Sequence, residues 1–137
     1  MKRFEFIDHT ADIGIMAYGS SLEQVFVNAA CGMFSLIANP DKVTAHISRK
    51  ISLTAHDREE LLVVWLNHLL YLFDADNLIF NRFDSFQIND HELIAIACGE
   101  KVDPLKHHLK THIKAATYHQ LEIVEDDGFR AQVIFDI

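Results

Sequence analysis

The residues best suited to chemistry in this chain of 137 residues are acidic and lie near its two ends. Asp8, His9 and Asp12 belong to the stretch DHTADIG, and the sequence finishes with Asp136 and Ile137, which adds a terminal carboxylate. Carboxylate oxygens favour calcium or magnesium over zinc. The residues therefore predict an oxygen-rich cation site, although the aspartates could also serve as turn caps and solvated ends of strands.

Other chemical signatures are weak or absent. The histidine-rich stretch HHLKTH at residues 107–112 lacks cysteines and the HExxH pattern of zinc enzymes, so solvated loop histidines explain it better than a metal site. The sequence has no GxSxG elbow, P-loop or GxGxxG motif. It therefore shows no general signature of catalysis or of nucleotide binding.

Composition limits the class of protein. Half of the residues are hydrophobic, which predicts one compact domain over residues 1–137. The net charge is −8 and no run of Lys and Arg follows a phosphate backbone, so we expect a protein partner rather than direct tight binding to nucleic acid. There is no uncharged stretch of about 18 apolar residues and no apolar run of a signal peptide. We therefore expect a cytoplasmic protein without membrane contact.

Periodicity predicts the elements that must position the acidic residues. Short strands at 4–7 and 13–18 flank the acidic turn, and a capping box at Ser20 and Glu23 opens a helix that ends before Asn39-Pro40. A second helix is capped by Asp57, and its body is apolar nearly all round, so it should pack on more than one side. Further strands are expected at 43–55, 78–88, 92–98, 112–117, 121–124 and 130–135, while 104–109 is either a short helix or a loop.

This order of elements predicts an α+β fold with a mainly antiparallel sheet and two principal helices. The succession of a strand, a helix and two or more strands can be read twice along the chain. The turn signal Asp126-Asp127-Gly128 predicts a hairpin between the last two strands.

Several separated motifs closely resemble those of the archease family, over a match that runs from about residue 4 to the end of the chain. These motifs are DHTADIG (8–14), AYG (17–19), ELL and WLN (60–62 and 65–67), GE (99–100), KAATYH (114–119) and FDI (135–137). The resemblance implies strand-helix-strand-strand (SHS2-like) modules, one inserted in another. It also implies an accessory protein that is not itself an enzyme.

The implied activity is to help an RtcB-type RNA ligase, which joins RNA ends in tRNA splicing or RNA repair, by promoting its guanylylation and multiple turnover. The family's metal site corresponds to Asp12, Asp136 and Ile137, and calcium is the ion that the resemblance implies. Lys106 and Lys114 resemble basic positions that approach the ligase or its nucleotide.

Three further residues are candidates for contact with the partner or its nucleotide. Asp8 and His9 lie in the acidic turn. His119 ends a stretch whose small residues would let another backbone or a ligand come close.

Two other functions remain open at this point. A metal-dependent phosphoesterase could use Asp12 and Asp136 as ligands and His9 as a general base, and it would turn over phosphoesters alone. A structural adaptor could bind a protein partner by strand addition, and its binding would survive chelation.

Overall fold

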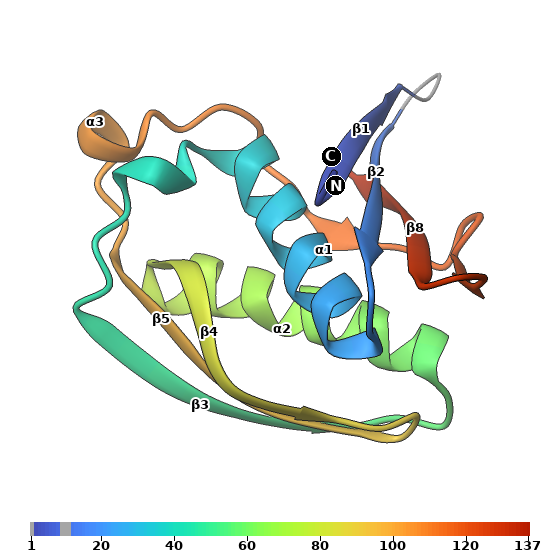
Figure 1. Ribbon diagram of the computed structural model, residues 1–137. Coiled ribbons are helices and arrows are strands. Elements are labelled where there is room, and N and C mark those ends of the chain that lie inside the picture. Colours follow the sequence, from blue (N-terminus) through green and yellow to red (C-terminus); the bar gives the residue numbers. More distant parts are fainter. Residues whose placement is uncertain (1, 9–11) are drawn as a thin grey trace.

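Two long helices lie between two antiparallel sheets in the computed structural model, which describes residues 2–8 and 12–137 (Figure 1). Helices α1 (Leu22–Ile37) and α2 (Arg58–Asp76) each contact both sheets and each other. The main hydrophobic core is continuous through these three layers. The fold class predicted from the sequence, α+β with antiparallel sheets and two principal helices, is confirmed.

The larger sheet has five strands in the order β1-β2-β8-β6, with β7 also paired to β8. Its strands are β1 (Phe4–Asp8), β2 (Ile13–Gly19), β6 (Ala115–Ala116), β7 (Glu122–Glu125) and β8 (Phe129–Asp136). The smaller sheet has the order β3-β5-β4, with β3 (Ile47–Thr54), β4 (Leu78–Ile88) and β5 (Glu92–Lys101). Strand β8, the last in the sequence, therefore lies inside its sheet.

The inserted module predicted from the family resemblance is visible in the connectivity. The contiguous segment 47–101 forms β3, α2, β4 and β5, a strand-helix-strand-strand unit. It interrupts the other unit between α1 and the strands β6 to β8. In Figure 1 the smaller sheet accordingly lies on the opposite side of the helices from the larger one.

Helix α1 begins one residue later than predicted. Ser21, not Ser20, is the N-cap, and its side chain accepts a hydrogen bond from the Gln24 N–H at 3.1 Å. The Gln24 Oε1 accepts the N–H of Ser20, the residue before the N-cap, at 2.9 Å. Gln24 rather than Glu23 thus takes part in the cap, and its side chain reaches the residue before the N-cap.

Helix α2 is packed on several sides, as its apolar sequence predicts. Asp57 caps it by accepting the Glu60 N–H at 2.8 Å. Trp65 is fully buried, donates its indole N–H to the Phe26 carbonyl at 3.0 Å, and meets the rings of Phe83 and Phe86 edge-on. No helix of the described residues is long and apolar enough to cross a membrane.

Two predicted strands are shorter than the alternation indicated. The strand expected at 43–55 begins only at Ile47, because the residues before it leave the 3-10 turn η1 (Pro40–Lys42) as irregular chain. The strand expected at 112–117 is reduced to β6. The segment left open at 104–109 contains the short helix α3 (Pro104–His107).

Candidate functional site

The β2–β8 ladder places acidic residues from the two ends of the chain at one end of the larger sheet. Ile13 lies opposite Phe135. Asp12 comes directly before Ile13, and Asp136 directly follows Phe135, so both flank the same end of this ladder. Ile137 follows with its side chain 45% exposed. Phe135 itself is fully buried and anchors the end of β8.

Strand alternation separates Asp8 from Asp136. Asp8 lies opposite Ile13, which in turn lies opposite Phe135, so all three side chains share one face of the sheet. Asp136, the next residue along β8, has its side chain on the other face. His9 lies outside the described residues.

Among residues 2–8 and 12–137, no three His, Cys, Asp or Glu side chains are grouped so that they could hold a metal ion. A cation at this end would therefore need further oxygen ligands in addition to the side chains of Asp12 and Asp136.

Strand β6 places Lys114 beside the end of β8. Ala115 lies opposite Asp136, and the Lys114 N–H donates to the Asp136 carbonyl at 2.8 Å. Lys114 is exposed. A basic residue thus lies on the far side of Asp136 from β2, so the end of the sheet carries both signs of charge.

Asn67 on α2 holds the outer side of β6. Its Oδ1 accepts the Ala116 N–H at 2.8 Å, and its Nδ2 donates to the Ala116 carbonyl at 3.2 Å. These are the two groups that a further strand would otherwise pair. Asn67 belongs to the WLN motif but was given no role from the sequence, and its amide side chain among apolar residues of the helix is the signal that could have pointed to one.

Asn67→Ala is expected to lower the free energy of unfolding by about 2 kcal/mol or more, because it leaves the N–H and C=O of the buried Ala116 without their hydrogen-bond partner. Urea denaturation measures this loss, and amide hydrogen exchange at Ala116 should accelerate. Tyr71→Ala, at an exposed position one turn along α2, is the matched control. Equal stability of the two variants would contradict the role of Asn67.

Lys106 lies in a separate charged cluster on α3. Its ammonium contacts both oxygens of Glu100, at 2.9 Å and 2.8 Å. The Thr44 N–H also donates to Glu100, at 2.6 Å. Lys106 is thus engaged within the protein, although its side chain remains 40% exposed. Sequence reasoning gave no role to Glu100.

The prediction that the histidines of residues 107–112 are solvated is wrong for His107. This side chain is fully buried. Its Nδ1 accepts the Asp103 N–H at 2.9 Å, so its proton lies on Nε2, which donates to Glu100 at 3.0 Å. His107 therefore fastens α3 to β5, whereas His108 and His112 are exposed.

The hydrogen bonds from Lys106, Thr44 and His107 lower the pKa of Glu100 to about 2, against the opposing effect of burial. The carboxylate thus stabilises the fold above its ordinary pKa, and this contribution disappears as the pH falls from about 4.5 towards 2. Glu100→Gln should cost on the order of 2 kcal/mol at pH 7 and progressively less at acid pH.

Urea denaturation of wild type and Glu100→Gln from pH 7 to pH 3 measures this convergence. Glu92→Gln, an exposed change on the same strand, provides the control. A difference that stays constant with pH would show that the charge of Glu100 does not matter.

His119 lies between β6 and β7 on the same edge of β8. It is exposed, and its N–H donates to the Thr117 hydroxyl at 3.3 Å. Because β6 and β7 both pair with β8, the residues between them form a loop along this edge. The structure thus places His119 and Lys114 on one edge, while Lys106 lies apart on α3.

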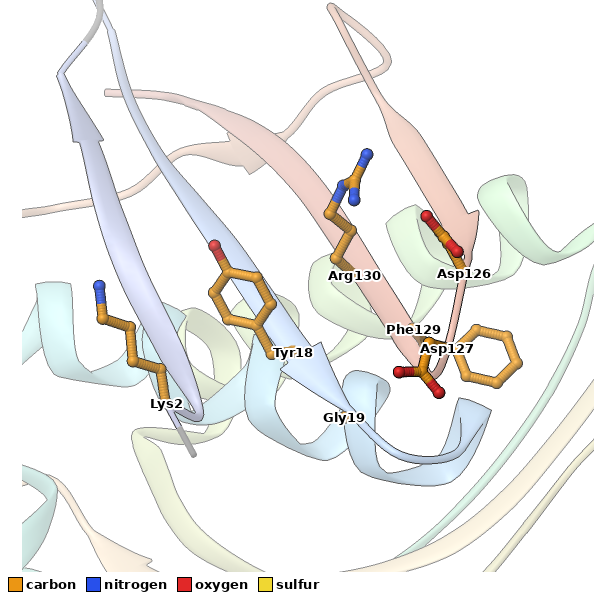
Figure 2. A pocket seen from close by; sticks show the side chains of 7 residues that line it. All are labelled: Lys2, Tyr18, Gly19, Asp126, Asp127, Phe129 and Arg130. Atoms are coloured by element: carbon orange, nitrogen blue, oxygen red, sulfur yellow. The ribbon is translucent and has the colours of Figure 1, made fainter.

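A cavity of about 280 Å³ lies at the opposite end of the β2–β8 ladder (Figure 2). Figure 2 shows the side chains of Tyr18 on β2 and Arg130 on β8, with Lys2 just before β1 and Asp126 at the β7–β8 hairpin. The Tyr18 hydroxyl donates to Glu5, which raises the pKa of this tyrosine. None of the predicted site residues that the structure describes lines this cavity.

The chain matches the model of the Archease protein family (MTH1598/TM1083) over residues 4–137. A protein named archease from Methanosarcina acetivorans is 45% identical, with 99% of this chain and 97% of that protein covered. The archease of Pyrococcus abyssi is 40% identical, and the match covers both proteins completely.

Solved structures agree with these relationships. The solution structure of protein 1598 from Methanobacterium thermoautotrophicum superposes with a TM-score of 0.86 at 39% identity, over 100% of both chains. A crystal structure from Thermotoga maritima, described as an archease and possible chaperone, has the same fold, with a TM-score of 0.66 at 21% identity over 96% of this chain and 94% of that one. With the family match and these close relatives, the chain belongs to the archease family.

Proposed function

We propose that this protein is an accessory activator of an RtcB-type RNA ligase and promotes its guanylylation and multiple turnover in tRNA splicing or RNA repair. Membership of the archease family supports this proposal. The observation that supports it is the end of the larger sheet, where Asp12 just before β2, Asp136 at the end of β8 and Lys114 just before β6 flank the same end of the strands. The exposed charges of Asp136 and Lys114, with the half-buried Asp12 beside them, suit contact with a partner's polar active site.

Asp12, Asp136 and Ile137 are the residues that would hold a divalent cation, with calcium as the expected ion. Their oxygen donors fit a hard cation, and the exposure of Asp136 and Ile137 leaves room for water or partner ligands. When bound, such an ion would supply positive charge close to phosphate oxygens. Lys114, directly before the neighbouring strand β6, would add a second positive charge.

The chain's own contribution is to hold these groups in place. The buried Phe135 fixes the end of β8, and Asn67 fixes β6, so Asp136 and Lys114 are presented on a rigid edge. Rigid presentation matters because a charged group displaced by about 1 Å loses much of its effect on a reacting phosphate.

The direct test is RNA-end joining by a purified RtcB-type ligase at limiting concentration, with GTP and manganese, in the presence and absence of this protein. Guanylylated ligase and joined RNA are followed together. We expect more guanylylation and more than one turnover per ligase when the protein is added.

Two outcomes would count against the proposal. If guanylylation and RNA joining by the ligase were unchanged when the protein is added, the protein would not be an activator. Hydrolysis of phosphoesters by the protein alone would instead favour a metal-dependent phosphoesterase.

A further inference from the structure

The edge strand β1 directs backbone groups away from the larger sheet. The Tyr18 N–H donates to the Arg3 carbonyl at 2.9 Å, and Phe4 lies opposite Ala17, so the odd-numbered residues of β1 bond to β2. Phe4 and Phe6 therefore point their N–H and C=O groups outward. Within the described part of the chain, β1 pairs only with β2. This spacing of donors and acceptors is that of an unpaired strand edge.

A groove of about 660 Å³ runs beside this edge. Phe4 and Phe6 of β1 form one wall, and Phe80 and Asn81 of β4 contribute to the other. The small side chains of Cys31 and Ser35 on α1, and of Ala38 directly after α1, also line the groove. Phe6 is 54% exposed, so an apolar ring faces solvent on a wall of the groove.

The groove carries positive charge at both ends, on a protein whose net charge is −8. Arg3 is held at one end by donating to Asn28 at 3.1 Å and to the Cys31 sulfur at 3.0 Å. Lys110 lies at the other end, where its N–H donates to the Ile37 carbonyl at 2.7 Å. Cys31 and Ile37 are separated by about 9 Å along α1.

Asp41 is the single carboxylate among the described residues that line the groove. The charges therefore favour an acidic occupant, and the apolar ring between them favours one that also carries an apolar side chain. The outward backbone groups favour an extended polypeptide over a small molecule, because only a second strand pairs with them at a two-residue repeat.

We infer that the β1 edge and this groove dock an extended segment of a partner protein with an acidic, an apolar and a second acidic residue at alternate positions. The backbone of the segment pairs with Phe4 and Phe6, and its apolar side chain covers Phe6. The two acidic side chains, about 13 Å apart along the strand, approach Arg3 and Lys110. This docking does not depend on the identity of the partner or on the acidic end of the sheet.

The probe is the peptide acetyl-Thr-Asp-Thr-Val-Thr-Asp-Thr-amide, titrated into the ¹⁵N-labelled full chain while amide shifts are followed by NMR. We expect shifts confined to residues around Phe4, Phe6 and Lys110. Two analogues carry N-methyl groups on alternate backbone nitrogens, one on each edge of the peptide. The analogue methylated on the edge that faces β1 should bind at least about tenfold more weakly than the parent peptide, whereas the other analogue should bind like the parent.

Charge is tested by a lysine peptide and by variants. Replacing both Asp residues of the peptide with Lys should abolish measurable binding. Lys110→Glu should weaken binding of the acidic peptide about two- to fivefold, whereas Lys50→Glu, an exposed change on β3, should not.

The inference is overturned if both methylated analogues bind like the parent, if the lysine peptide binds equally well, or if millimolar peptide shifts no amide near β1. Shifts of these same amides by GMP, in the absence of any effect of the peptide, would identify the groove as a nucleotide site instead. A peptide effect together with a failed ligase assay would leave this docking surface intact and remove only the activator function.

Discussion

Asp136→Asn is expected to reduce stimulation of ligase guanylylation by at least about 10-fold to 100-fold, the range measured when even a supporting partner of a metal ligand is removed. The change keeps the shape of the side chain but removes its charge. Asp136 is exposed at the end of β8, so the fold should survive. The measurement is the fraction of guanylylated ligase at limiting GTP, with stability of the variant checked by urea denaturation.

Glu122→Gln is the matched control, because it removes an exposed carboxylate from β7 of the same sheet without touching the acidic end. It should stimulate the ligase like wild type. Normal stimulation by Asp136→Asn would show that this carboxylate takes no part in activation. An equal loss in both variants would point to general charge rather than to a site.

Gly99→Val is expected to cost more than about 3 kcal/mol of stability and to leave little folded protein. A Cβ atom at position 99 would lie 1.8 Å from the Ile79 carbonyl oxygen and 2.8 Å from the Phe80 Cα. Both contacts are with backbone, so only a displacement of β4 from β5 could relieve them. Glu100, which organises the charged cluster on α3, would move with the strand.

Gly32→Ala provides the comparison, measured with Gly99→Val by urea denaturation. Its added Cβ would approach the ring of Phe4 at 3.1 Å and the side chain of Ile15 at 3.3 Å. Side chains can shift, and alanine favours a helix by about 1 kcal/mol over glycine, so the net change should be small. Similar losses in the two variants would mean that β4 can yield, contrary to the packing described.

Local periodicity predicted the helices and most strands well. The strand at 78–88 was predicted with its observed ends, and the Asp126-Asp127-Gly128 turn does join β7 to β8. The strand expected at 112–117 is only two residues long, and Asn67, rather than another strand, satisfies the outer side of Ala116. His107 was misjudged because its burial depends on Glu100, a contact that residue types around position 107 do not reveal.

The candidate site could be predicted only as residue types. Carboxylates near both ends suggested a cation site, and the archease resemblance selected Asp12 and Asp136 among them. That Asp12 and Asp136 flank one end of a ladder follows from the pairing of β2 with β8, whose residues are more than a hundred positions apart. Pairing over such a separation depends on the whole core and not on any local pattern.

The interior position of β8 has a consequence for how the molecule is made. During synthesis on the ribosome, residues 47–101 emerge as a contiguous unit that can begin to form its own sheet and helix. Strands β2, β6 and β7 must wait, because each pairs with β8 and β8 is translated after all three. Until then β2 exposes an unpaired edge, and ribosome-bound chains should be sensitive to proteolysis there. The end of the sheet that holds Asp12 and Asp136 can thus form only after β8 has been made.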